Sequence, residues 1–184
     1  MGTLFVDKLD PQSGTSLEIG SSGDTITIPS GATITNSGTA TGFGEANTPN
    51  FHAKTSSQSI SASTSTVVVY SAEDFDTSSL YNTSNGRFTV DANTTGKYFF
   101  YAAVKYASSS ISRNDLTINK NGTAVLRTEF GNSTSYPTVL VSGMVNLSSS
   151  GDYVEVKVNQ NDGTKSLSGE SEGNFFGGFR VTSW

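Results

Sequence analysis

Residues 96–106 constrain the fold of this chain more than any other stretch. They read Gly-Lys-Tyr-Phe-Phe-Tyr-Ala-Ala-Val-Lys-Tyr, and an aromatic run of this kind between turn-forming residues predicts a β-strand. Side chains alternate between the faces of a strand, so Tyr98 and Phe100 share one apolar face while Phe99 and Tyr101 share the other. A strand that is apolar on both faces must be covered twice. We expect one face to pack in the core and the other to contact a second copy of the chain.

The composition favours an all-β protein that completes its core by self-association. Serine and threonine make up 54 of the 184 residues, and apolar residues make up 34%. No segment sustains the 3.6-residue period of an amphipathic helix. A chain this polar buries a modest core in each copy, which favours oligomerisation to complete that core.

Several classes of function are excluded by composition. The chain has no cysteine, which rules out disulfides and thiolate metal sites. No apolar run approaches the roughly 20 residues of a membrane helix, so we predict no membrane insertion. The net charge is −5 and the 11 Lys and Arg residues are scattered, so nucleic acid is not an expected partner. The first residues lack the basic and long apolar regions of a secretory signal, which predicts synthesis in a cytoplasm.

Residues 1–14 form the first of three predicted segments, an N-terminal anchor. They contain Leu4, Phe5 and Val6, and an apolar cluster beside little else is costly to leave in water. We expect this cluster to dock on a larger assembly. The alternative is a frayed terminus.

Residues 15–46 form the second segment, a predicted stem and hinge. Very short Ile/Thr stretches recur here, each ended by glycine or proline, and they contribute Ile19, Ile26, Ile28 and Ile34. One chain cannot bury so few side chains, whereas three chains wrapped around one axis stack them into a short β-repeat stem. A flexible Ser/Gly/Thr linker is the alternative.

Residues 47–184 form the third segment, which has longer strands. We predict strands at 51–54, 66–70, 86–90, 96–106, 116–119, 124–127, 138–145, 153–158 and 175–181. Lys120-Asn121-Gly122 is a hairpin signal between two of them. Eight to ten strands separated by frequent turns are typical of a β-sandwich or jelly roll.

Seven motifs in this segment stand in a recognisable order. They are Phe51-x-Ala53, Asn82 with Gly86-Arg87-Phe88-Thr89, Gly96-x-Tyr98-x-Phe100, Asn121-Gly122, Ser142-Gly143, Gly151-Asp152-x-Val154-x-Val156 and Phe176-Gly177-Gly178-Phe179. The segment resembles the globular head of complement 1q and its tumour necrosis factor-like relatives. The resemblance implies a ten-stranded jelly roll assembled as a homotrimer, with Tyr98 and Phe100 in the core and Phe99 and Tyr101 near the trimer contact.

The N-terminal part departs from the animal members of that family. A collagen-like Gly-X-Y stalk is missing, and the Ile/Thr/Ser/Gly stem stands in its place. This lead, with Val6-Asp7 and residues 25–40, looks like the N-terminal portion of structural proteins from tailed phages, notably those of marine bacteria. The two resemblances together imply a virion protein with an anchor, a thin stem and a trimeric knob.

Asp74 and Asp76 are the candidate metal ligands, because Glu73-Asp74-Phe75-Asp76 is the densest acidic cluster in the chain. Calcium takes six to eight oxygen ligands, and the family resemblance implies that some relatives bind calcium near the trimer axis. The glycine and distal glutamate of a calcium loop are missing, so a solvated loop is favoured over a calcium site. We predict no other cofactor.

Residues 169–173, Gly-Glu-Ser-Glu-Gly, match the pattern of a hydrolase nucleophile elbow. That motif requires a helix to follow the serine, whereas Asn174-Phe175-Phe176 reads as a strand. The only histidine, His52, precedes the serine and is expected to be a surface or interface side chain. A glycosidase needs two carboxylates facing across a cleft, which the sequence does not indicate. We predict no catalytic residues.

Aromatic residues in loops can stack on sugars. Tyr136 and Tyr106 are the candidate glycan contacts, with packing as the alternative for each.

These observations predict a non-enzymatic, trimeric structural protein of a phage virion, made in the host cytoplasm. Its N-terminus would bind other virion proteins, and its knob would contact a host-surface glycan or protein as part of a fibre. The alternative is a capsid decoration protein that stabilises the shell. A depolymerase tailspike is a third hypothesis, and it predicts that the purified protein cleaves sugar chains.

Overall fold

The computed structural model describes residues 9–37, 48–107, 111–133 and 136–183. The chain divides into two units, residues 1–43 and 44–184, which we treat separately. Within the described ranges, no helix is long and apolar enough to cross a membrane.

Residues 9–37 of the first unit contain no helix and no strand. Two turns interrupt an otherwise irregular backbone: the Asp24 N–H donates to the Ser21 carbonyl at 2.9 Å, and the Ala32 N–H to the Pro29 carbonyl at 3.1 Å. The four isoleucines of the predicted stem are all exposed, from 47% to 60%. The short strands expected here are not formed within residues 9–37 of a single chain. We attribute this to the lack of other described residues that cover the four isoleucine side chains. The three-chain stem stays a prediction.

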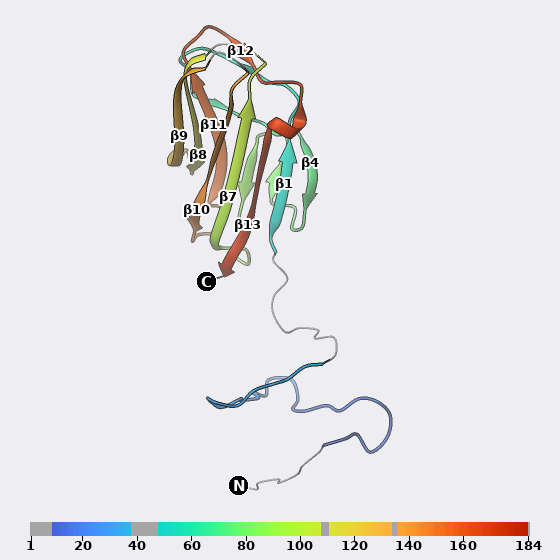
Figure 1. The fold of residues 1–184 in the computed structure, drawn as a ribbon. Helices are drawn as coiled ribbons and strands as arrows, with labels where there is room; N and C mark the ends of the chain where they lie inside the picture. The colour runs from blue at the N-terminus through green and yellow to red at the C-terminus, as the bar shows by residue number, and fades with distance from the viewer. Residues whose placement is uncertain (1–8, 38–47, 108–110, 134–135, 184) are drawn as a thin grey trace. The chain divides into compact units, whose positions relative to one another are not determined.

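The second unit is an all-β sandwich (Figure 1). One sheet has the order β10 (Thr138–Leu147), β7 (Gly96–Lys105), β13 (Phe175–Ser183), β1 (Asn50–Lys54) and β4 (Ala72–Asp76). The other has the order β5 (Tyr81–Asn82), β6 (Arg87–Thr89), β11 (Tyr153–Gln160), β8 (Ile111–Lys120) and β9 (Thr123–Ser133), and β3 (Thr66–Val67) also pairs with β11. A two-stranded ribbon joins β2 (Ser59–Ile60) to β12 (Lys165–Ser166), and a 3₁₀ turn, η1 (Ser171–Gly173), precedes β13.

The predicted all-β class is confirmed, and each predicted strand overlaps an observed one, although of the strand predicted at 66–70 only Thr66–Val67 pairs. The described residues form thirteen strands rather than ten, partly because β2, β5 and β12 are two-residue pairings too short to leave a sequence pattern. β4 covers the acidic run Glu73 to Asp76, which was expected to be a solvated loop. The run is largely exposed as expected, but it is a strand and not a loop: it pairs antiparallel with β1, and Asp74 is the extra residue of a bulge at that pairing.

The core lies between the two sheets and is rich in aromatic rings. As predicted, Tyr98 and Phe100 of β7 are fully buried. The ring of Phe51 lies 5.1 Å from that of Tyr81, 4.7 Å from that of Phe88 and 4.9 Å from that of Phe176. These rings come from four strands of both sheets, so one cluster fixes how the sheets pack.

Two buried tyrosines tie the loop before β4 into the core. The Tyr70 hydroxyl donates to the Ala103 carbonyl at 3.1 Å. The Tyr81 hydroxyl donates to the Tyr70 carbonyl at 3.1 Å and accepts from the Tyr70 N–H at 3.2 Å. Burial raises the pKa of both phenols, so both stay protonated as donors.

Candidate functional site

The outward side of the five-stranded sheet carries aromatic side chains on four adjacent strands. We call this set the aromatic face: Phe75 of β4, His52 of β1, Phe175 and Phe179 of β13, and Phe99 and Tyr101 of β7. The antiparallel register places Phe179 opposite Phe99, and His52 opposite Phe75. Because alternate residues of each strand point the same way, side chains distant in sequence meet on one surface.

The rings of the aromatic face contact one another. The His52 ring centroid lies 6.1 Å from that of Phe75, 6.0 Å from that of Tyr101 and 5.8 Å from that of Phe175. Phe99 and Phe179 are 5.6 Å apart. These contacts leave most of the rings half-buried, while Phe75 stays 49% exposed. The face is thus ordered by its own contacts but remains open on its outer side.

Gly177 creates the space that Tyr101 occupies. Gly177 pairs with Tyr101 across β13 and β7. A Cβ atom at this glycine would lie 2.5 Å from the Tyr101 Cζ and Oη atoms and 2.9 Å from the Phe51 carbonyl oxygen. The tyrosine ring therefore lies across the bare backbone of β13. Its burial there raises the pKa of Tyr101.

Aliphatic side chains extend the aromatic face over the edge strand β10. Leu140 and Met144 are 52% and 50% exposed, and Met144 pairs with Phe99. Val181, on the bulge of β13, is 53% exposed. An antiparallel sheet that faces water on one side normally carries polar residues there. A broad apolar surface instead marks a contact with another molecule.

A small polar cluster lies beside the aromatic face. Asp74 accepts from Lys54 Nζ at 2.9 Å and lies 2.8 Å from His52 Nδ1. These interactions, that of Lys54 first, lower the pKa of Asp74. The Asp76 carboxylate instead accepts from the backbone N–H groups of Ser78 at 3.1 Å and Tyr81 at 2.7 Å.

The two predicted calcium ligands therefore have different partners. Asp74 is paired with Lys54 and His52, and Asp76 closes the turn after β4. Among the described residues, no group of three or more His, Cys, Asp or Glu side chains is placed to hold a metal ion.

The other predicted site residues are separated by the fold. Tyr106 is fully buried and its hydroxyl donates to Asn114 Oδ1 at 2.8 Å, so its prediction as a glycan contact was wrong. Tyr136 is 57% exposed and stays a candidate. Ser171 lies on η1, which β13 follows, so the helix that a nucleophile elbow requires does not come after this serine. The proposed anchor, Leu4 to Val6, lies outside the described residues.

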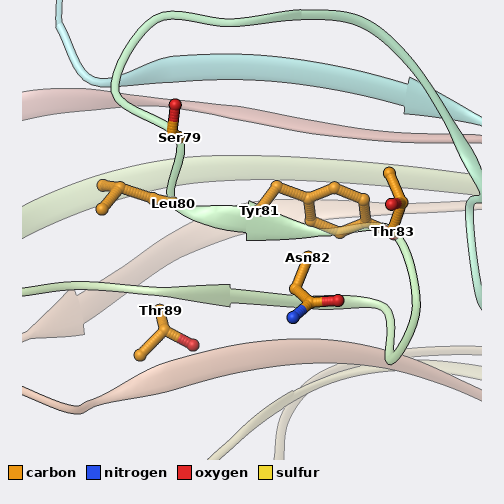
Figure 2. Close-up of a pocket in the computed structure, with 6 residues that line it drawn as sticks. All are labelled: Ser79, Leu80, Tyr81, Asn82, Thr83 and Thr89. Carbon is orange, nitrogen blue, oxygen red and sulfur yellow. The ribbon is translucent and has the colours of Figure 1, made fainter.

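A pocket of about 400 Å³ lies beside β5 and β6 (Figure 2). It is lined by Ser79, Leu80, Tyr81, Asn82, Thr83 and Thr89. The Tyr81 hydroxyl is used by the Tyr70 backbone, and Asn82 Oδ1 accepts from the Ser84 N–H at 2.9 Å. The lining residues include no acidic or basic side chain, so the pocket offers no acid–base pair for catalysis.

Sequence reasoning identified Phe99 and Tyr101 but missed the partners of the aromatic face. From the sequence, Phe175 and Phe179 are expected only as part of the last predicted strand, and Phe75 only as part of an acidic loop. The alternation in Phe175-Phe176-Gly177-Gly178-Phe179 is a signal that places its first and last rings on one face. Only the strand order brings these rings beside β7.

Comparison with known proteins gives one family and several similar folds. The C1q domain model matches residues 50–181. The globular domain of zebrafish complement 1qA protein is 19% identical with a TM-score of 0.52, covering 74% of this chain and 99% of that one. Murine APRIL at pH 8.0 is 18% identical with a TM-score of 0.53, covering 72% and 98%. At these identities the structural likeness concerns the fold alone, and no curated protein matches the sequence.

Proposed function

The chain belongs to the C1q domain family, and from this premise we propose that it is a non-enzymatic structural protein that assembles as a homotrimer through its aromatic face. The observation that supports this most is the open apolar surface of the five-stranded sheet. Phe75, Leu140 and Met144 are each about half exposed there. Fully burying an exposed side chain of this size contributes about 1.5–3 kcal/mol, so a second copy seated on this surface gains roughly half of that from each of these half-exposed side chains.

A ring of three copies fits this surface better than a face-to-face pair. The polar cluster of Asp74, His52 and Lys54 lies toward the β4 side of the sheet, whereas Leu140 and Met144 lie on the β10 side. The two sides differ in chemistry, which suits a head-to-tail contact between unlike surfaces. Head-to-tail contacts close into rings when the rotation between copies allows it.

We further propose that this head is the knob of a virion fibre, anchored by residues 1–14 and carried on a stem of residues 15–46. The exposure of Ile19, Ile26, Ile28 and Ile34 in the single chain supports a stem whose isoleucines are covered by two other chains. Three knobs on one stem would sum weak contacts with a host-surface glycan or protein into useful avidity.

Phe99→Asp tests the role of the aromatic face. A buried carboxylate without a partner is costly, so sedimentation velocity should detect monomers or aggregates in place of the native species. Val125→Asp is the matched control, because Val125 is 45% exposed on β9, in the other sheet. A Phe99→Asp variant that sediments like the native protein would contradict the proposed interface.

Immuno-electron microscopy of virions, with antibodies against the purified chain, tests the fibre role. We expect label at fibre tips. Label over the shell would support capsid decoration instead, and unlabelled virions would contradict both.

A further inference from the structure

A second pocket, of about 170 Å³, opens on the outer side of the six-stranded sheet. It is lined by Ser65, Asp115, Thr117, Asn119, Ala124, Arg127, Val158 and Asn159. β8 contributes Asp115, Thr117 and Asn119 at alternate positions, and Asn159 of β11 lies directly opposite Asp115. The pocket therefore lies on the sheet opposite the aromatic face and stays open when that face is covered.

Three oxygen acceptors in this pocket lack a hydrogen-bond partner among the described residues. They are Asp115 Oδ1, Asn119 Oδ1 and Asn159 Oδ1. Asp115 and Asn119 are each only 6% exposed. Buried acceptors are normally paired, and an unpaired one is costly. The pocket is thus prepared for a group that donates hydrogen bonds.

The neighbouring contacts fix the direction of these acceptors. Asn119 Nδ2 donates to the Gly122 carbonyl at 3.0 Å, which leaves Oδ1 as the free end of that amide. Asp115 Oδ2 is paired with Arg127 and, at 3.4 Å, with Arg113. The Thr117 hydroxyl donates to the Lys157 carbonyl at 3.3 Å, which leaves its oxygen free to accept.

The charges around the pocket select an uncharged ligand. Arg127 and Arg113 neutralise Asp115, and Arg113 also pairs with Glu129 at 2.8 Å. A divalent cation would meet two guanidinium groups here and would lack the six to eight oxygens that calcium takes. An anion would be repelled by the three free acceptor oxygens. Hydroxyl groups suit this pocket, because each hydroxyl can donate to a free acceptor oxygen and accept from Arg127.

We infer that this pocket binds a sugar residue through its hydroxyl groups. The inference goes beyond the proposed assembly and does not depend on it, because the pocket lies within one copy and on the other sheet.

Nuclear magnetic resonance of the isotope-labelled full chain tests this inference. Glucose, galactose, mannose and N-acetylglucosamine are added separately at tens of millimolar, and calcium chloride is added alone in a parallel series. We expect at least one sugar to shift the side-chain amide signals of Asn119 and Asn159 saturably. Signals that no sugar moves, or that calcium alone moves, would overturn the inference.

A pair of variants locates the binding. Asn159 is half-buried, so Asn159→Ala removes one free acceptor with little risk to the fold, and we expect sugar affinity to fall roughly tenfold. Asn161→Ala is the matched control, because Asn161 is exposed in the loop after β11. Equal affinity in the native protein and Asn159→Ala would place any sugar elsewhere. The native mass of each variant is recorded separately, so loss of sugar binding is distinguished from loss of assembly.

Discussion

At the scale of single residues, Asp152 links two turns of the six-stranded sheet. Its carboxylate accepts from Asn121 Nδ2 at 2.7 Å and from the Ser149 N–H at 3.1 Å, and it pairs with Lys120 Nζ at 2.9 Å. Burial alone would raise the pKa of Asp152, but these hydrogen bonds outweigh burial and the pKa is lowered. A lowered pKa means that the folded state favours the ionised carboxylate.

The pH dependence of stability follows from that direction. Because the folded pKa of Asp152 lies below the unfolded value, its contribution is complete above about pH 5 and is lost as the pH falls through the folded pKa. Asn121→Gly removes the donor to Asp152 and also the Asn121 Oδ1 atom that accepts from the Tyr153 N–H at 2.9 Å, and it keeps the positive φ of 49° at this position. We expect it to lower the free energy of unfolding at neutral pH by about 1 kcal/mol and to flatten the acid-side loss. Urea unfolding across that pH range measures both, and identical slopes for both proteins would contradict this role.

The contribution of the Tyr81 hydroxyl to stability can also be tested at the scale of single residues. Tyr81→Phe leaves the buried N–H and carbonyl of Tyr70 without their partner. The free energy of unfolding should fall by about 1–3 kcal/mol, as measured by denaturant unfolding. Tyr136→Phe, at a site 57% exposed, is the control and should change stability little. Equal stability of the two variants would show that the Tyr70–Tyr81 contact contributes nothing.

At the scale of elements, β13 shapes the aromatic face through Gly177. A methyl group at Gly177 would overlap the Tyr101 ring and the Phe51 carbonyl. Overpacking of this kind costs about 1–3 kcal/mol, and a displaced Tyr101 would also disturb assembly.

Gly177→Ala tests the effect of this overlap on stability and assembly, with Gly169→Ala as the control. At Gly169 an added Cβ would meet only the Ser56 carbonyl oxygen, at 3.9 Å. We expect thermal unfolding and native mass to change in the first variant and to stay unchanged in the second. Two variants that behave alike would mean that the close approach of Tyr101 to β13 does not matter.

The elements differ in how far the sequence could predict them. β7, β10 and β11 have long apolar or alternating patterns, and all three were predicted. β4 was not predicted, because its single outward ring, Phe75, stands among three acidic residues that are typical of a loop. A bulge also interrupts the alternation of side chains along this strand. The prediction that Tyr106 is an accessible loop residue was wrong, because this tyrosine directly follows β7 and packs inward.

At the scale of the whole molecule, strand order decides the site. The order β10-β7-β13-β1-β4 brings together strands far apart along the chain. Local pattern can show that Phe99 points away from the core, but it cannot show that Phe179 lies beside it. The polar pocket is likewise invisible to motif reading, because Asp115, Asn119 and Asn159 are ordinary outward residues of two strands.

A single copy leaves the aromatic face open, and the proposed trimer would cover it. The most direct test is the mass of the native full chain in dilute buffer, measured by light scattering coupled to size-exclusion chromatography. We expect a single species of three times the 19.3 kDa chain mass, as the proposed trimer requires. A stable particle of 19.3 kDa would contradict it.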